Sequence, residues 1–340
     1  MVTSRMRSIS HHIVKIEIPD ILPLEQLQKS ASSDIIPVNA LNGQRAIIWC
    51  TMKRIFTPKT EYILSMLVFG TLAPFVRGIG VTSGEVALYR AVLASVLIGT
   101  YLLVTHTKIP FRSAKKDIAL LVLSGMAMGF NWVFLFQAYK YTSVSIATLS
   151  YYFAPVIVTI ASPIIFHEKL TKKQILCFLG STVGLILITE IQGGKGGSDW
   201  IGILFGLGAA CLYATVILLN KFIRSVEGIQ RTFLQFLAAV IAVLPYVALT
   251  DGFHLGSLDV KGWILLLIVG LFHTGITYCL YFNSLRNLPG QQAAVLGYLD
   301  PLVAVFISVA FLEERLTLLQ GIGALLILGF SLWNELGNKN

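Results

Sequence analysis

The chain has 340 residues, of which 55% are hydrophobic and only 13% are charged, and its mean hydropathy is +0.76. Soluble domains carry about 25% charged residues, so this composition excludes an ordinary soluble protein. The net charge of +9 does not indicate a nucleic-acid partner, because the lysines and arginines flank apolar segments and no nucleic-acid-binding motif accompanies them. We therefore predict an all-α integral membrane protein in the lipid bilayer.

Residues 1–58 precede the first long apolar segment and mix polar with apolar residues. The stretch "HHIVKIEIPDILPLEQLQ" carries charges where a signal peptide would need an apolar core. We interpret 1–58 as a flexible cytoplasmic extension. Two origins stay open for residues 1–51, either a native extension or a consequence of start-site choice.

Ten apolar segments follow, each close to the roughly 20 residues that cross the hydrocarbon core as a helix. The predicted spans are 62–80, 84–104, 117–139, 142–165, 172–190, 199–220, 229–249, 260–283, 289–312 and 316–336. With both termini in the cytoplasm, twenty lysines and arginines lie on the cytoplasmic side and five outside. This bias predicts that orientation, and we expect the protein in the cell (inner) membrane.

One stretch occurs twice, 146 residues apart. "TIASPIIFHEKLTKKQ" begins at Thr159, and "VFISVAFLEERLTLLQ" begins at Val305. We divide the spans into two repeats, 62–190 and 199–336. Because five spans are an odd number, the second repeat would cross the membrane in the opposite direction, as in inverted-repeat transporters. This explains why Lys172 and Lys173, on the cytoplasmic side, are replaced by leucines in the second copy.

Both copies of this stretch end in a helix-starting pattern. Thr171 with Gln174, and Thr317 with Gln320, have the spacing of a capping box, in which each side chain binds the other residue's backbone N–H. We interpret Glu168 and Glu314, just before these pairs, as parts of solvated turns at the membrane interface. A role in substrate handling is the alternative.

Several motifs resemble those of a known family. They are "ALYRAVLAS" in the second span, "YYFAPVIVTIASPIIFHEKLT" with its counterpart "GYLDPLVAVFISVAFLEERLT", and the "GSTVGLILI" helix. Residues 62–336 resemble the drug/metabolite transporter superfamily, specifically its EamA-type members. The resemblance implies ten helices around a central cavity, alternating access, and export of amino acids, other metabolites or drugs.

The fourth span carries the clearest polar face. Its members are spaced by 3, 4, 3, 4 and 3 residues, which places them along one side of a helix. They are Ser145, Thr148, Tyr152, Pro155, Thr159 and Ser162, and their counterparts are Gln291, Ala294, Tyr298, Pro301, Val305 and Ser308. We predict that Thr148, Tyr152, Gln291 and Tyr298 line a substrate cavity. Hydrogen bonding between helices is the alternative.

Asp300 lies near the middle of its predicted span, too deep to reach water. A desolvated carboxyl group favours its protonated form, so Asp300 is a candidate for proton coupling or for binding a substrate amine. A structural, hydrogen-bonded aspartate is the alternative. Pro155 and Pro301 each remove a backbone hydrogen bond nearby, and we predict that they act as hinges.

Other candidates come from the third, eighth and second spans. We predict that Asn131, Trp132, His273, Thr277 and Tyr278 line the cavity, where the aromatic rings could stack on a planar or cationic substrate. Helix packing is the alternative for each of them. We expect Arg90 to reach the outer interface and to have a structural role.

The leading prediction is a secondary transporter that exports small metabolites such as amino acids, with a cationic-compound exporter as the alternative. The sequence contains neither an H-E-x-x-H zinc motif nor a G-x-S-x-G elbow, so a membrane-embedded enzyme is disfavoured. Nor do the four scattered cysteines suggest a disulfide framework or a metal site. We expect a small-molecule substrate and no cofactor or nucleic acid, and the oligomeric state stays open.

Overall fold

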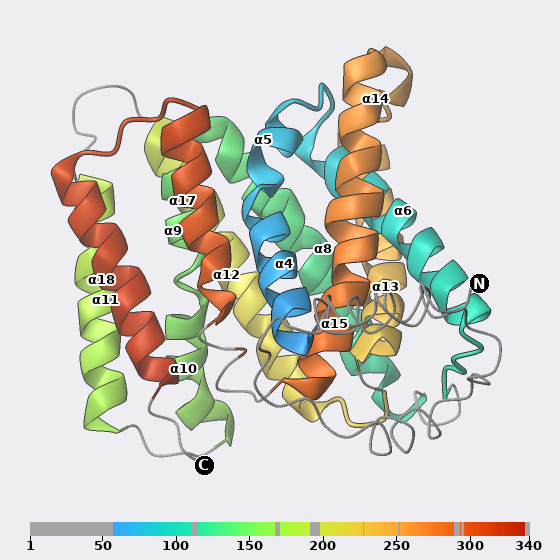
Figure 1. The fold of residues 1–340 in the computed structure, drawn as a ribbon, viewed down its shortest axis with the longest axis horizontal. Helices are drawn as coiled ribbons and strands as arrows, with labels where there is room; N and C mark the ends of the chain where they lie inside the picture. The colour runs from blue at the N-terminus through green and yellow to red at the C-terminus, as the bar shows by residue number, and fades with distance from the viewer. Residues whose placement is uncertain are drawn as a thin grey trace, which may run out of the picture. The chain divides into compact units, whose positions relative to one another are not determined.

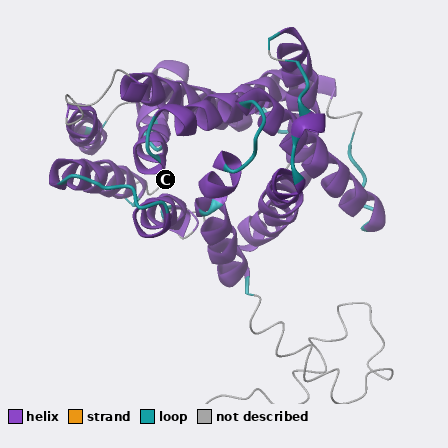
Figure 2. Cartoon of the chain, turned by 90° about the horizontal axis from the view of Figure 1, so that it is seen from above, coloured by secondary structure: helices purple, strands orange, loops and turns teal. Residues whose placement is uncertain are grey.

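A computed structural model describes residues 57–110, 115–166, 171–190, 198–226, 228–250, 252–288, 293 and 296–336. Helices account for nearly all of these residues, and no strand occurs among them (Figures 1 and 2). The predicted all-helical class is therefore confirmed. The predicted extension 1–58 lies almost entirely outside the described residues.

The helices follow one another with short connections. In the first part of the chain they are α4 (Pro58–Gly70), α5 (Leu72–Arg77), α6 (Ser83–Val104), the short η2 (Lys115–Asp117), α8 (Ile118–Tyr141), α9 (Val144–Tyr151), α10 (Ala154–Phe166) and α11 (Lys172–Glu190). In the second part they are α12 (Ser198–Phe222), α13 (Gly228–Leu249), η3 (Leu255–Ser257), α14 (Val260–Leu267), η4 (Ile268–Ile276), α15 (Thr277–Asn287), α17 (Leu299–Phe311) and α18 (Leu318–Glu335).

Three predicted spans are less regular than expected. The first divides at Thr71 into α4 and α5, and the fourth divides at Tyr152 and Phe153 into α9 and α10. Pro155 follows the second break, in the first turn of α10, where its missing N–H costs no helix hydrogen bond. The eighth span contains the π-helix η4 between α14 and α15. Wide π turns are rare and often occur near functional sites.

The structure has the properties of a multi-pass membrane protein. Within the described part of the chain, six helical stretches are long and apolar enough to cross a bilayer, namely Ser83–Val104, Lys115–Tyr141, Val144–Ser162, Trp200–Phe222, Gly228–Leu249 and Val260–Ser284. Shorter apolar helices cover Leu299–Phe311 and Leu318–Asn334. Large apolar side chains such as Leu103, Ile164 and Leu325 are about three quarters exposed. Water would penalise such a surface, whereas lipid would cover it.

The connections between helices meet in two sets at opposite ends of the bundle. We call the first set the Glu314 end, which lies beside α5 at the top of Figure 1. Its hydrogen bonds run from Lys140 Nζ to Val81 O, from His254 N to Glu85 Oε1 and from Arg77 Nη1 to Glu314 Oε1. We call the end that holds the second set the Arg231 end, because Arg231 lies there in the first turn of α13. There, Arg224 N donates to Asp117 Oδ2, and Gln230 Nε2 donates to Lys108 O.

The last helices of the two predicted repeats, α11 and α18, pack against each other in opposite directions. Gly180 lies against Phe330, and Gly184, further along α11, lies against Gly323. The contact therefore moves backwards along α18 as α11 advances. At the start of α11, Lys173 Nζ lies 5.7 Å from the centre of the Trp333 ring, near the end of α18. Residues Lys172 and Leu318 accordingly begin their helices at opposite ends of this pair.

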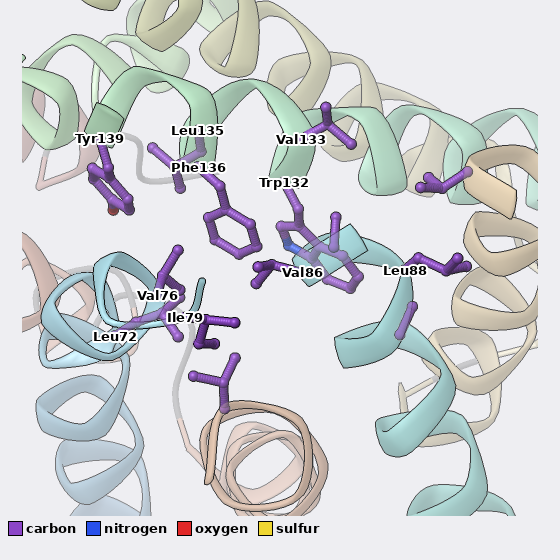
Figure 3. Packing of buried hydrophobic residues seen from close by; sticks show 14 of the residues in the cluster. Leu72, Val76, Ile79, Val86, Leu88, Trp132, Val133, Leu135, Phe136 and Tyr139 are labelled. Atoms are coloured by element: carbon purple, nitrogen blue, oxygen red, sulfur yellow. The ribbon is translucent and has the colours of Figure 1, made fainter. Parts of the chain in front are cut away.

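A large apolar cluster fills the space between α5, α6 and α8. Figure 3 shows Trp132, Leu135, Phe136 and Tyr139 extending from α8 toward the side chains of α5 and α6. Glycines allow α8 to approach α13 closely: a Cβ at Gly125 would lie 2.4 Å from Gln235 O. Such close backbone contact is how helices associate in lipid, where hydrophobicity does not drive them together.

Candidate functional site

The helices enclose one large cavity of about 600 Å³ among the described residues. Its wall is aromatic and polar: eight of the twelve tyrosines of the chain line it, namely Tyr62, Tyr139, Tyr151, Tyr152, Tyr213, Tyr278, Tyr281 and Tyr298. Their rings contact one another, with centroids 5.4 Å apart for Tyr151 and Tyr213. A cavity of this size suits a small organic molecule, and tyrosines offer it both an apolar face and a hydroxyl.

The cavity runs most of the length of the bundle. Toward the Glu314 end it stops at Tyr139, Thr148 and Ala304. Toward the Arg231 end it reaches Asn220 and Gly228, which lie at the end of α12 and the start of α13. Tyr139 lies two residues before the end of α8 and Asn220 two residues before the end of α12, so helix termini border the cavity at both ends.

A hydrogen-bonded network lies beyond the cavity at the Glu314 end. Both carboxylate oxygens of Glu314 accept from the N–H of Val144, at 3.0 and 2.9 Å, and Ser308 Oγ also donates to Glu314. Ser145 Oγ donates in turn to Ser308 Oγ at 2.6 Å. Since Val144 is the first residue of α9, a carboxylate at this position satisfies otherwise unpaired N–H groups and interacts favourably with the helix dipole.

Arg77 connects this carboxylate to a second region of the chain. Its Nη1 donates to Glu314 Oε1 at 2.6 Å, its Nε to Tyr139 O at 2.9 Å and its Nη2 to Thr142 O at 2.6 Å. The Glu314 side chain is only 14% exposed. The interpretation of Glu314 as a solvated turn is therefore wrong, because its carboxylate is mostly buried and accepts hydrogen bonds from Arg77 and Val144. These partners lie 237 and 170 positions away in sequence. Glu168 lies outside the described residues.

A different network surrounds the cavity at the Arg231 end. Gln235 of α13 donates through Nε2 to Ser124 Oγ of α8 at 2.6 Å and to Asn220 Oδ1 of α12 at 2.7 Å. Arg231 Nε donates to Val226 O at 2.9 Å. The bond to Ser124 joins α13 to α8, and these two helices pack together along their length. The bond to Asn220 joins α13 to α12, two helices that line the cavity and make few other contacts with each other.

Asp300 lines the middle of the cavity. It is the second residue of α17, and Tyr152 at the break between α9 and α10 donates its hydroxyl to Asp300 Oδ2. Tyr62, Tyr139 and Tyr213 line the same space. This is the only carboxyl group on the described cavity wall, so it is the one acidic group that a bound molecule could meet there.

The structure places the predicted site residues in two groups. Six of them line the cavity, namely Trp132, Thr148, Tyr152, Tyr278, Tyr298 and Asp300, as does the predicted hinge Pro155. Three others lie in helix contacts away from its wall, namely Asn131, His273 and Thr277. Gln291 lies outside the described residues. Pro301 is buried in the first turn of α17, one residue after Asp300.

Each residue away from the wall has a structural partner. Asn131 Nδ2 donates to Ala209 O of α12 at 2.7 Å, and Thr277 Oγ1 donates to Phe272 O at 2.7 Å. The His273 ring packs against Phe75, with centroids 4.7 Å apart. The polar face predicted on the fourth span is also divided: the break at Tyr152 turns Thr159 toward Asn334 of α18 instead of toward the cavity.

Arg90 contradicts its predicted place at the membrane interface. It lines the cavity and is only 3% exposed. Its guanidinium lies over the Trp132 ring at 4.5 Å and near the Phe136 ring at 5.5 Å. Snorkelling requires a free path to the interface, and the packing of α6 against α8, α13 and η4 removes that path.

Sequence reasoning also missed several lining residues. Tyr62, Tyr139, Tyr151, Tyr213 and Tyr281 all lie inside apolar spans, where a phenol hydroxyl must find a polar partner or a cavity. That repeated occurrence of tyrosine was a usable signal. Gln235 and Asn220 gave a weaker one, because polar residues near span ends are common.

The chain resembles known transporters over most of its length. It is 31% identical to the uncharacterized transporter YxxF of Bacillus subtilis (strain 168), over 80% of this chain and 87% of the relative. It is 24% identical to the uncharacterized inner membrane transporter YhbE of Escherichia coli (strain K12), over 75% and 83%. A known crystal structure with 15% identity superposes with a TM-score of 0.55 over 81% of this chain and 96% of the other, which shows a shared fold.

A family model matches the chain twice, at residues 62–190 and again at 200–334. The two matches together cover most of the described helices, including every helix that lines the cavity. They also agree with the predicted resemblance, which is confirmed. This multi-pass membrane protein belongs to the EamA-like transporter family.

Proposed function

We propose that the protein is a secondary active transporter that exports small amphipathic metabolites, such as amino acids, by alternating access through the tyrosine-lined cavity. The observation that carries this proposal is the difference between the ends of the cavity. A network centred on Glu314 lies beyond one end and joins Arg77 to the start of α9, whereas the hydrogen bonds at the other end run between wall residues such as Gln235 and Asn220. A carrier exposes its site to one side of the membrane at a time, and this arrangement fits a state that faces the Arg231 end.

We further propose ten membrane-spanning helices arranged as two inverted five-helix repeats. Helix contacts support this arrangement, because several of the most extensive ones have a counterpart when the repeats are exchanged. The α8–α12 contact corresponds to α15–α4, α8–α13 to η4–α6, and α9–α12 to α17–α4. The opposite directions of α11 and α18 agree with it. The Arg231 end includes the lysine-rich and arginine-rich connections, so we place it and both termini in the cytoplasm of a cell whose inner membrane holds the protein.

A counterflow assay tests the transport function. Proteoliposomes preloaded with a mixture of unlabelled amino acids should accumulate an external labelled amino acid transiently and saturably. An aqueous pore would equilibrate the label without saturation, and an empty-liposome signal equal to the protein signal would contradict transport. Cells that overexpress the protein, compared with control cells by metabolite analysis of medium and cytosol, would then identify the exported compound.

Asp300 is our candidate for the coupling group. A carboxyl group enclosed by tyrosines can alternate between binding a proton and accepting the Tyr152 hydroxyl, so its protonation would accompany the change of access. We expect the Asp300→Asn variant to lose the pH dependence of transport while it keeps exchange at a fixed pH. A variant that retains the full pH dependence of the wild type would exclude this role.

A cationic compound is the second candidate substrate. One feature favours it, namely that Asp300 lies in a cavity whose wall consists largely of tyrosine rings, which attract cations through their faces. The substrate would then bind between aromatic rings and the carboxylate. Arg90 on the same wall argues against it, because a buried guanidinium repels a cation.

A further inference from the structure

We propose that Arg90 is the anion-binding subsite of the cavity and that the transported molecule carries a carboxylate. This proposal rests on the proposed transport function, and it specifies the chemical class of the substrate. It differs from the expectation that Arg90 is a structural residue at the membrane interface. Four observations about the described residues carry it.

The first observation is burial without a counter-ion. Arg90 is 3% exposed, and within the described part of the chain no carboxylate forms a salt bridge with it. Arginine stays protonated in proteins, so this position holds a permanent positive charge in a low-dielectric environment. A buried unpaired charge is strongly unfavourable unless a binding partner compensates it.

The second observation is an unused hydrogen-bond donor. Arg90 Nη1 is buried and has no hydrogen-bond partner, although most buried polar groups in proteins have one. A carboxylate can accept from two guanidinium nitrogens at once. The third observation is position, because Arg90 lies on the wall of the same cavity as Asp300 and the tyrosines.

The fourth observation is that the guanidinium is oriented. Arg90 Nε donates to Thr274 Oγ1 at 2.6 Å, and Thr274 Oγ1 donates in turn to Val269 O of the π-helix η4 at 2.7 Å. Trp132 lies against one face of the guanidinium at 4.5 Å. The π-helix thus supplies a carbonyl that directs the threonine lone pair toward Arg90. The guanidinium is therefore held on one edge and one face in a fixed orientation.

A carboxylate fits this subsite better than a phosphate. A phosphate group usually needs several cationic groups, and Arg90 and Arg231 are the two lysine or arginine residues on the described wall. They lie at different levels of the cavity, since Arg231 is near the start of α13 and bonds to backbone carbonyls of Val226 and Asn220. Arg90 therefore acts alone on a single anionic group.

The test measures binding to purified full-length protein by thermal stabilisation, with matched compounds as probes. L-leucine is compared with 4-methylvalerate, which lacks the amine, and with isoamylamine, which lacks the carboxylate; L-phenylalanine, 3-phenylpropionate and phenethylamine form a second set. We expect at least one carboxylate-bearing member to bind at least tenfold more tightly than the amine of its set. Inorganic phosphate is a separate arm, and stabilisation by phosphate alone would overturn the carboxylate assignment.

Variants assign the effect to Arg90. We expect Arg90→Gln to remove the tenfold preference and Arg231→Gln, which makes the same charge change on the same wall, to retain it. If Arg90→Gln does not fold, Arg90→Lys should bind carboxylates at an intermediate level, because an ammonium group cannot donate two parallel hydrogen bonds. Equal binding of acid and amine by the wild type, no stabilisation by any acid, or an unchanged preference in the folded Arg90 variants would overturn the proposal.

Counterflow in proteoliposomes separates this proposal from the proposed function. Carboxylate binding without saturable counterflow would leave the subsite in place and remove the transport function. Counterflow of a compound that has no anionic group would have the reverse meaning: transport would stand, and the role of Arg90 as an anion-binding residue would be excluded.

Discussion

The two ends of the cavity use similar polar groups in different ways. At the Glu314 end, one carboxylate receives hydrogen bonds from Arg77 and from the start of α9, which are far apart in sequence. At the Arg231 end, Gln235 bonds to Ser124 on α8, which packs against α13, and to Asn220 on α12, which makes few other contacts with α13. The first network depends on a few charge-assisted bonds, and the second combines side-chain hydrogen bonds with the packing of α13 on α8.

This difference indicates which contacts break most easily when an end of the cavity opens. A junction made of a few bonds to one side chain can be lost in a single step, whereas a wall made of packed helices resists change along its whole length. We therefore expect the Glu314 network to break when that end opens, and alternating access then requires the helices at the Arg231 end to close.

Replacing Glu314 should open that end. Glu314→Gln removes the charge from the bonds to Arg77 and Val144, and we expect a loss of about 3 kcal/mol in the free energy of unfolding, since hydrogen bonds to charged groups contribute about 1.5–3 kcal/mol each and this site is partly exposed. A cysteine introduced at Thr148, at the Glu314 end of the cavity, should then react several-fold faster with a membrane-impermeant thiol reagent added on the extracellular side.

The matched control is Glu313→Gln, which makes the same change one residue earlier at an exposed side chain. It should leave both the stability and the Thr148→Cys labelling rate near those of the parent protein. If Glu314→Gln and Glu313→Gln label at the same rate, the Glu314 network does not close the cavity.

A larger side chain at the contact between α8 and α13 should destabilise the protein. Gly125→Ala would place a Cβ 2.4 Å from Gln235 O and 2.5 Å from the Ala238 Cβ, so α8 and α13 must separate. We expect a loss of about 2 kcal/mol in unfolding free energy, typical of overpacking, measured in mixed detergent micelles. Gly329→Ala is the control, because nothing lies within 4 Å of its Cβ position. It should be neutral or slightly stabilising, and equal stability of both variants would refute close packing of this wall.

The helix caps at Thr171 and Thr317 have the same local structure, so we expect the same loss of stability when either cap is removed. Thr171 Oγ1 accepts from Gln174 N at 3.2 Å, and Thr317 Oγ1 accepts from Gln320 N at 3.2 Å, so both predicted capping boxes form. Thr171→Ala and Thr317→Ala should each lower the unfolding free energy by about 1 kcal/mol, and serine at either position should restore it. A much larger effect at one of them would show that the cap also takes part in closing that end.

Much of the local structure was predictable from sequence. The capping boxes depend on residues three positions apart, and most helix boundaries agree with the predicted spans within a few residues. The family was also predictable, because its motifs occur twice. The breaks at Thr71 and Tyr152 and the π-helix η4 were not, since each depends on packing against other helices.

The site was predictable only in part. Tyr152, Tyr278 and Tyr298 lie on the cavity wall, but His273 and Thr277, chosen by the same reasoning, lie in helix contacts. A polar side chain in an apolar span must satisfy its hydrogen bonds, and either a cavity or a neighbouring helix can do so. Sequence periodicity identifies the face of a helix and does not show what that face meets.

Composition and local sequence patterns were enough to predict the membrane environment, the family and the helix caps, because transfer into lipid and capping depend on composition and on neighbours a few residues away. The packing of the helices brought Glu314 to Arg77 and the start of α9, and left Arg90 on the cavity wall with no carboxylate partner among the described residues. Those contacts join residues up to 237 positions apart. They depend on how each helix is rotated about its own axis in the assembled bundle, which no local pattern specifies.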